Sequence, residues 1–269
     1  MGEVITVKET DFIFNEGTPK GITHAILYDA VGADHVPAVI GASLVEDRNP
    51  IGYMTSKHIH SSPHTFLDVG FTGWPIYRKG NTLIIEVLTP AHISKDIGQQ
   101  KNAWLFNYPP ARDVASMLVS LDVETFVVIT SSSFDEMMKG ESQEECIVVE
   151  AEDIGDKHTH TSLQPLWGWL PAFMFSVEKV GASILIVPAH GARVQPQPYN
   201  ITKIREALGI LKQRGYDTVG ALSRSKKIYS NASEEASEAA KHANEVIARM
   251  KMASKKDTGT GAMFQRDMK

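Results

Sequence analysis

The chain of 269 residues contains a single cysteine, Cys146, and no apolar run long enough to form a membrane-spanning helix. One cysteine cannot form an intrachain disulfide, so we expect a cytoplasmic protein in which Cys146 is a buried, unreactive core residue. A membrane helix requires about 20 consecutive apolar residues, and no segment approaches that length. The first ten residues, MGEVITVKET, also lack the apolar stretch of a signal peptide.

The sequence also lacks a strong charge and the common motifs of cofactor binding. The formal net charge is only −5, which argues against sequence-independent binding to nucleic acid, because such binding relies on an excess of lysine and arginine. Neither the G-x-G-x-x-G nor the G-x-x-x-x-G-K-[ST] pattern occurs. There is no nucleophile elbow. We therefore expect no cofactor, no nucleic-acid partner and no membrane partner.

What the sequence does contain is an alternation of short apolar runs with amphipathic helical stretches. This alternation predicts an α/β fold with a mixed, mostly parallel sheet. The expected strands are an edge strand or hairpin arm over Glu3–Phe14 and the segments Ile22–Ala30, Pro50–Ser56, Asn81–Leu88, Thr125–Thr130, Cys146–Glu150 and Ala182–Val187. The expected helices are Asp34–Glu46, one that begins at Pro109-Pro110, Pro165–Val180, one that Asn200 caps and Gly215 ends, and Asn231–Ala253. We expect one domain over residues 1–253, with a small β excursion near 58–80 and a flexible tail over 254–269.

Polar residues follow two of the expected central strands. Ser131, Ser132 and Ser133 come after Thr125–Thr130, and His190 comes after Ala182–Val187. Ligands of open α/β folds bind at the carboxyl ends of the strands, where hydroxyl and backbone N–H groups can hold an anion. These four residues are the candidate ligand pocket, although an ordinary strand-to-loop transition explains the serines equally well.

Histidines form two H-x-H pairs, His58 with His60 and His158 with His160. Alternate residues of a strand point to the same side, so each pair has the side chains for a zinc ion. His64 follows the first pair. The spacing matches no established zinc signature, and a solvated loop rich in histidine is the alternative. We therefore assign no metal site and retain the four paired histidines as candidates only.

An aromatic cluster occupies the expected helix Pro165–Val180. The apolar residues of WGWLPAFMF surround this helix instead of forming one stripe, so another surface must bury them. We expect self-association through this helix, and we expect Trp169→Asp to break the oligomer. The candidate interface residues are Trp167, Trp169, Phe173 and Phe175.

Taken in order, these elements resemble the proteasome assembly chaperone 2 family, including its archaeal and bacterial members. The segments that carry the resemblance lie between Gly21 and Met252 and include THAILYDAVGADHVPAVIGASLV, PHTFLDVGFTGWPIYRKGNTLIIEVLTPAH and LQPLWGWLPAFMFSVEKVGASILIVPAHG. The resemblance implies a three-layer α/β/α sandwich related to nucleoside phosphorylase-like folds. It also implies self-association and protein binding, with proteasome subunits among the partners, instead of catalysis.

Two features differ from the family. The opening turn YDAVGADHVP is poorer in glycine, and Arg266–Lys269 is not a hydrophobic–Tyr–any residue tail, so the resemblance does not imply docking through such a tail. The alternative hypothesis is an enzyme or ligand-binding protein of phosphorylase- or hydrolase-like fold that acts on a small polar ligand. Its site would use the serines and His190.

Overall fold

The computed structural model describes residues 2–29, 36–47, 49–56, 73–87, 103–133, 145–150, 181–189, 198–228 and 230. The chain divides into two compact units, residues 1–226 and 227–269. The described residues of the second unit, Lys227, Ile228 and Ser230, are helical. All strands and the three labelled helices belong to the first unit. In the described part of the chain, no helix is both long and apolar enough to cross a membrane.

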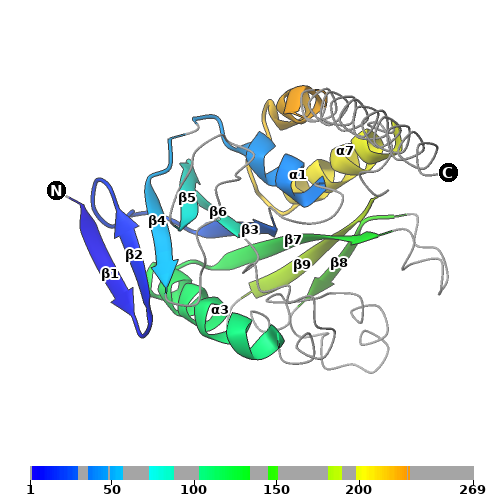
Figure 1. Ribbon diagram of the computed structural model, residues 1–269. Coiled ribbons are helices and arrows are strands. Elements are labelled where there is room, and N and C mark those ends of the chain that lie inside the picture. The colour runs from blue at the N-terminus through cyan, green and yellow to red at the C-terminus, as the bar shows by residue number, and fades with distance from the viewer. Residues whose placement is uncertain are drawn as a thin grey trace, which may run out of the picture. The chain divides into compact units, whose positions relative to one another are not determined.

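Within these ranges, nine strands form one sheet with the order β1-β2-β4-β5-β6-β3-β7-β9-β8 (Figure 1). The strands are β1 (Glu3–Val7), β2 (Thr10–Phe14), β3 (His24–Asp29), β4 (Gly52–Ser56), β5 (Trp74–Lys79), β6 (Thr82–Val87), β7 (Thr125–Ser133), β8 (Ile147–Glu150) and β9 (Gly181–Ala189). The helices are α1 (Val36–Leu44), α3 (Ala103–Ser120) and α7 (Pro198–Gln213). The strands predicted from the sequence are therefore confirmed, with one difference: Glu3–Phe14, expected to be one edge strand or hairpin arm, forms both strands of a hairpin, β1 and β2.

The sheet is mixed, as predicted, but its parallel part is smaller than expected. Strands β6, β3, β7 and β9 run parallel, and all other pairings of the described strands are antiparallel. The connections explain the difference. Only Lys8 and Glu9 separate β1 from β2, and Gly80 and Asn81 separate β5 from β6. Such short turns join antiparallel strands, because a parallel pair requires a crossover of a dozen or more residues.

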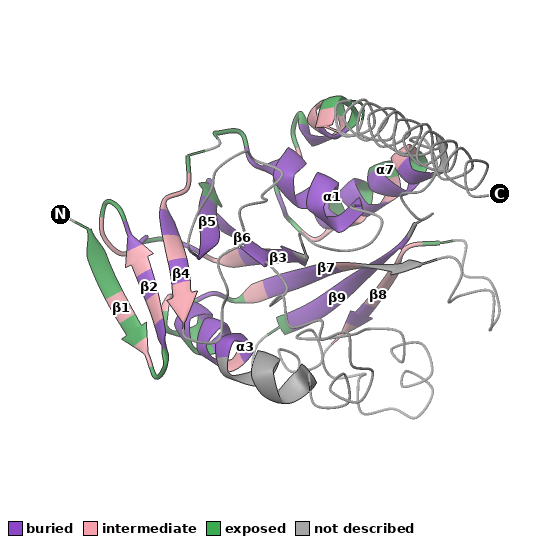
Figure 2. Cartoon of the chain, in the orientation of Figure 1, coloured by how far each residue is buried: buried purple, intermediate pink, exposed green. Residues whose placement is uncertain are grey.

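Helices lie on both faces of this sheet, which confirms the α/β class. Helices α1 and α7 lie together over one face, and α3 lies over the other (Figure 1). Every residue of α1 is buried, from Val36 to Leu44, and the strands beneath it are buried as well (Figure 2). The finer prediction, a relationship to phosphorylase-like sandwiches, stays a prediction.

Helix α3 begins earlier than the sequence suggested. Proline is favoured in the first turn of a helix, which placed the start at Pro109-Pro110. The helix instead begins at Ala103 and contains both prolines. The proline rule describes a local preference, which tertiary packing can override. Burial of Ala111, Val114 and Leu118 stabilises the part of the helix that follows the prolines. Likewise α7 begins at Pro198, so Asn200 is its third residue and not its cap.

Both long helices end with the same hydrogen-bonded turn. At the end of α7, Gly215 has a φ of 88° and its N–H donates to Lys212, while the N–H of Tyr216 donates to Leu211. This is a Schellman motif, and it confirms Gly215 as the end of the helix. Helix α3 repeats the pattern with Asp122, whose φ is 57°. Each turn leads the chain from the helix back toward the sheet.

A buried carboxylate joins α3 to the N-terminal hairpin. Asp113 is 0% exposed and accepts hydrogen bonds from the hydroxyl of Thr10 at 2.8 Å and from the backbone N–H of Glu9 at 3.3 Å. The guanidinium of Arg112 donates to its other oxygen at 2.8 Å. Four donors therefore converge on one carboxylate, counting both nitrogens of Arg112, and they attach the turn between β1 and β2 to the helix.

Several predictions fall outside the described residues. Among them are the helices Pro165–Val180 and Asn231–Ala253, the tail 254–269 and most of the β excursion near 58–80, of which β5 is described. These remain predictions.

Candidate functional site

The carboxyl ends of the parallel strands β6, β3, β7 and β9 are the first place to look for a site. The three candidate serines, Ser131 to Ser133, do not follow β7 as expected but form its last three residues. Their partners in the register are Val187, Pro188 and Ala189 of β9. Because these residues pair with β9, their backbone takes part in the sheet on the side that faces β9. The ladder therefore continues three residues beyond the predicted end of the strand.

The other candidate residues lie outside the described part of the chain. His190 follows the last residue of β9 directly in the sequence, but its position is not described. The same holds for the paired histidines His58, His60, His158 and His160, and for the aromatic residues Trp167, Trp169, Phe173 and Phe175. Among the residues that are described, no three His, Cys, Asp or Glu side chains gather as they would around a metal ion.

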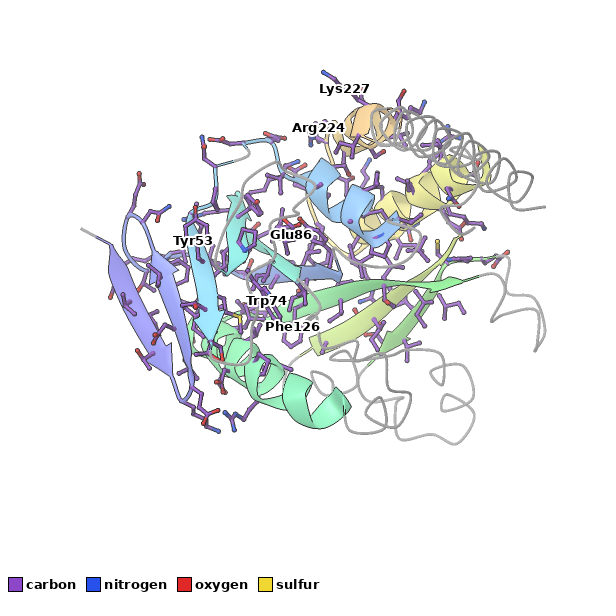
Figure 3. All side chains as sticks on the ribbon, viewed as in Figure 1. Tyr53, Trp74, Glu86, Phe126, Arg224 and Lys227 are labelled. Carbon is purple, nitrogen blue, oxygen red and sulfur yellow. The ribbon has the colours of Figure 1, made fainter. Side chains whose placement is uncertain are left out.

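The structure reveals a buried polar cluster that the sequence analysis did not include. It consists of Glu86 on β6, Tyr28 on β3 and Tyr77 on β5, three strands that are neighbours in the sheet. Glu86 and Tyr28 are partners in the parallel register, one residue before the end of each strand. Glu86 is labelled in Figure 3. Both are 0% exposed, and Tyr77 is 1% exposed. A carboxylate thus lies in the core between two tyrosines.

This environment determines the protonation of Tyr28. Loss of solvent raises the pKa of its phenol well above the usual value, and the nearby charge of Glu86 adds to the increase, followed by Tyr77. Tyr28 therefore keeps its proton at neutral pH. It can donate a hydrogen bond, but it cannot serve as a general base.

Helix α1 covers this cluster because one of its residues has no side chain. A Cβ atom placed on Gly41 would lie 2.1 Å from Cδ1 of Tyr28, and 2.2 and 2.4 Å from two further ring atoms. Real Cβ atoms do not approach other atoms so closely, so the ring lies directly against the helix backbone. Gly41 therefore allows α1 to close over the carboxyl end of β3.

One signal in the sequence marks this cluster. Glu86 is the one charged residue within the apolar run TLIIEVL, and charged residues are almost never fully buried unless they are paired. An acidic residue in a run expected to form a central strand was therefore an indication of a site. The tyrosines gave no such signal, since aromatic residues are common in strands.

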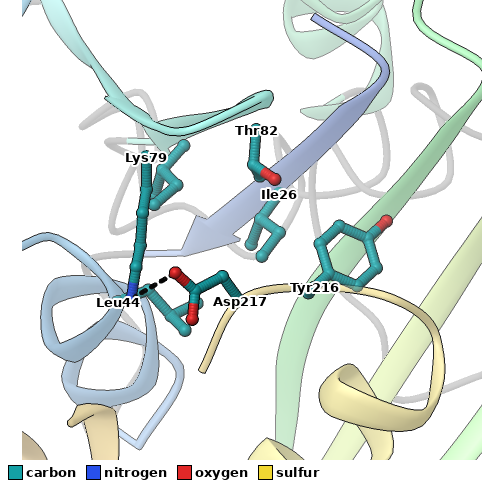
Figure 4. A pocket seen from close by; sticks show the side chains of 7 residues that line it. Ile26, Leu44, Lys79, Thr82, Tyr216 and Asp217 are labelled. Carbon is teal, nitrogen blue, oxygen red and sulfur yellow. Dashed lines mark ion pairs between the residues drawn. The ribbon is translucent and has the colours of Figure 1, made fainter. Parts of the chain in front are cut away.

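Charged residues also gather near Lys79, at the end of the strands opposite to the buried polar cluster. Lys79 is nearly buried, and its ammonium group lies 3.0 Å from Glu46, 3.4 Å from Asp217 and 3.3 Å from the carbonyl of Val219. Figure 4 shows Lys79 and Asp217 at a small hollow, which is also lined by Ile26, Leu44, Thr82, Ile84 and Tyr216. The hollow has no room for a water-sized sphere. Its charges therefore connect the turn after α1, strand β5 and the chain after α7, and they leave no space for a ligand in this hollow.

Cys146 is half-buried and contacts residues of α7. Its backbone N–H donates to the Glu206 carboxylate at 2.7 Å, and its Sγ lies 3.7 Å from the carbonyl of Lys203. Loss of solvent raises the pKa of the thiol to about 12, and the charge of Glu206 acts in the same direction. The thiol is therefore protonated at neutral pH, as an unreactive core cysteine should be.

We expect Cys146 to react with a thiol reagent such as Ellman's reagent about a thousandfold more slowly in the folded chain than in the unfolded chain at pH 8. The reason is that a pKa of about 12 leaves a thousandfold less thiolate than the ordinary value of 9.0. The control is the same reaction in 6 M guanidinium chloride. Equal rates in the two states would show that the folded thiol is not protected.

Comparison with known proteins supports the resemblance through structure alone. No established protein family and no curated protein matches the sequence. Solved structures do match. PbaA of Pyrococcus furiosus, described as an archaeal homolog of proteasome-assembly chaperone, aligns over 93% of this chain and 99% of its own, with a TM-score of 0.53 and 14% identity. This chain has the PbaA fold.

Two further structures share it. A Thermoplasma acidophilum protein of unknown function aligns over 82% of this chain and 90% of its own, with a TM-score of 0.55 and 11% identity. A Mycobacterium tuberculosis protein of unknown function aligns over 99% and 95%, with a TM-score of 0.50 and 10% identity. The predicted resemblance to the proteasome assembly chaperone 2 family is thus confirmed at the level of the fold.

Proposed function

We propose that this chain is an oligomeric, non-catalytic protein-binding module that acts in the cytoplasm as an assembly chaperone. The observation that carries the proposal is the likeness to PbaA, which extends over nearly the whole of both chains. The shared fold therefore includes the edge hairpin, the parallel strands and the helices on both faces of the sheet. The partners that the proposal implies are further copies of the chain and proteasome subunits.

The described part of the carboxyl edge supports a binding role. Two of its polar residues, Glu86 and Tyr28, have no exposed surface, and the ring of Tyr28 lies against the backbone of α1. A general acid or base must be reachable by a substrate and able to exchange a proton near neutral pH. Tyr28 meets neither condition. Its burial instead accounts for the close packing of α1 on β3.

The experiment is native mass spectrometry of the full chain, with and without purified proteasome α subunits from the same source organism. We expect a discrete homo-oligomer that captures α subunits. Trp169→Asp is expected to lower the mass of that oligomer, because it places a charge in the expected apolar interface. A chain that neither self-associates nor captures α subunits would contradict the proposal.

A second candidate function is the binding of a small polar ligand, as in the alternative drawn from the sequence. Glu86 favours it, since a buried carboxylate at the end of a parallel strand is placed where such folds bind ligands. The same spectra test it. A small mass that co-purifies with the wild-type chain and is lost from Glu86→Gln would favour ligand binding, while identical spectra would argue against a ligand held by Glu86.

A further inference from the structure

Strand β1 forms an open edge of the sheet. It occupies one end of the strand order, where β2 is its neighbour among the described strands (Figure 1). Glu3, Val4 and Thr6 are exposed, with Val4 at 56% (Figure 2). Exposure of this extent means that no other described part of the chain covers these three residues of β1. Its outward N–H and C=O groups are therefore available to another strand.

This edge lacks the features that usually prevent pairing. Protected edges carry lysine or proline, whereas β1 reads EVITV and consists mainly of β-branched residues. Its one charged side chain, Glu3, is turned to accept a 2.7 Å hydrogen bond from the N–H of Thr18. The opposite edge differs. Strand β8 has four residues and ends in Glu150, which pairs with Arg214.

An apolar row leads across the hairpin to this edge. In the register, Val4 of β1 pairs with Ile13 of β2, and Ile13 pairs with Tyr53 of β4. The row lies on the outer face, since Phe12, Phe14 and Met54 point to the other side and are buried. Ile13 and Tyr53 are half-buried, and Val4 at the end of the row is the most exposed. Tyr53 is labelled in Figure 3.

We propose that β1 pairs with β1 of a second copy of this chain, antiparallel about a two-fold axis at Val4. Val4 then lies opposite Val4 of the second copy. The row from Tyr53 through Ile13 to Val4 continues into the same row of the other copy, so the most exposed residue of each is covered. Glu3 lies opposite Ile5 of the other chain, so no like charges are directly opposed. The pairing joins two sheets into one.

A second copy fits this edge better than an unrelated extended segment. A two-fold interface brings the same patch from both subunits, so the exposed end of the row meets an identical exposed end. The inference rests on the proposed function in one respect, because it names a surface for the self-association proposed there. It does not depend on the aromatic helix or on binding to the proteasome.

The first test compares Val4→Lys with Val219→Lys by native mass spectrometry and light scattering of the full chain. Val219 is 76% exposed and lies after α7, so it is a matched control. Val4→Lys places two lysines opposite each other at the axis and is expected to weaken self-association by about tenfold or more. Val219→Lys should leave it unchanged. Equal masses for the two variants would overturn the inference.

The second test is oxidative cross-linking of Val4→Cys, with Val219→Cys as the control. Residues opposite each other in an antiparallel pair have Cα atoms about 4.5–5.5 Å apart, a distance that a disulfide spans. Val4→Cys is expected to give a covalent dimer, and Val219→Cys is not. The protonated thiol of Cys146 should contribute little. Absence of the dimer from Val4→Cys would overturn the inference even if the variant folds normally.

The outcomes separate this inference from the proposed function. A cross-linked Val4→Cys dimer in a chain that ignores proteasome α subunits would support the edge pairing and reject the chaperone role. Capture of α subunits without any cross-linked dimer would support the chaperone role and reject the edge pairing. If Val4→Lys abolished capture while the wild-type chain alone stayed monomeric, the edge would bind a partner segment, and pairing with a second copy would be wrong.

Discussion

Gly41→Ala is expected to lower the free energy of unfolding by about 2–3 kcal/mol, a large fraction of the stability of a domain. The added methyl group would lie 2.1 Å from the ring of Tyr28, so either the ring or α1 must move. The ring is fully buried, and every residue of α1 is buried as well, which leaves little space for adjustment. Urea unfolding followed by circular dichroism measures the change.

The matched control for Gly41→Ala is Gly209→Ala in α7. A Cβ atom at Gly209 meets no atom within 4 Å, so the substitution there should increase stability by about 0.5–1 kcal/mol. The two changes are chemically identical and both lie within helices. The explanation by contact with Tyr28 would fail if both substitutions changed stability by the same amount.

Asp113→Ala is expected to lower the free energy of unfolding by about 2–4 kcal/mol. The substitution removes the acceptor of the Thr10 hydroxyl, which is 0% exposed and cannot turn to water. It also removes the acceptor of the Glu9 N–H and the partner of Arg112. Because the lost contacts join α3 to the hairpin, we expect faster amide hydrogen exchange in β1 and β2 than in β3.

The control for Asp113→Ala is Asp11→Ala on the same hairpin. Asp11 accepts a 2.7 Å hydrogen bond from Thr6, but this pair is exposed. Exposed polar pairs contribute little because water replaces them, so the loss should be below about 1 kcal/mol. Similar losses from the two variants would mean that burial of Asp113 does not determine its contribution.

The sequence predicted the strands well because their signals are local. Runs such as FVVIT and ILIV are apolar and end in turn residues. The pattern of apolar residues and the turn residues that bound it therefore predict the same strands. The pairing of those strands was harder to predict. Strand β3 lies between β6 and β7, and nothing in HAILYD indicates which distant strands adjoin it. The start of α3 was misplaced because the prediction relied on the preference of proline for the first turn of a helix, whereas this helix continues through both prolines.

The site was less predictable than the fold. The serines after Thr130 were singled out because hydroxyls at a strand end suit anions, yet β7 continues through them. The cluster of Glu86, Tyr28 and Tyr77 comes from strands far apart in the sequence, and their contact depends on a strand order that one chain does not reveal. Gly41 is another example, since its role becomes evident only where α1 crosses Tyr28.

The position of β3 has a consequence for synthesis on the ribosome. Its neighbours in the sheet are β6 and β7, so its first partner is translated about 50 residues later than β3 itself, a costly delay for non-local pairing. During that interval the apolar segment HAILYD has left the ribosome without the strands that will cover its edges. Such a nascent chain exposes both edges of an apolar strand to other chains. The order of the strands in the sheet thus makes the interval before β6 is synthesised the one in which β3 is most exposed to incorrect pairing.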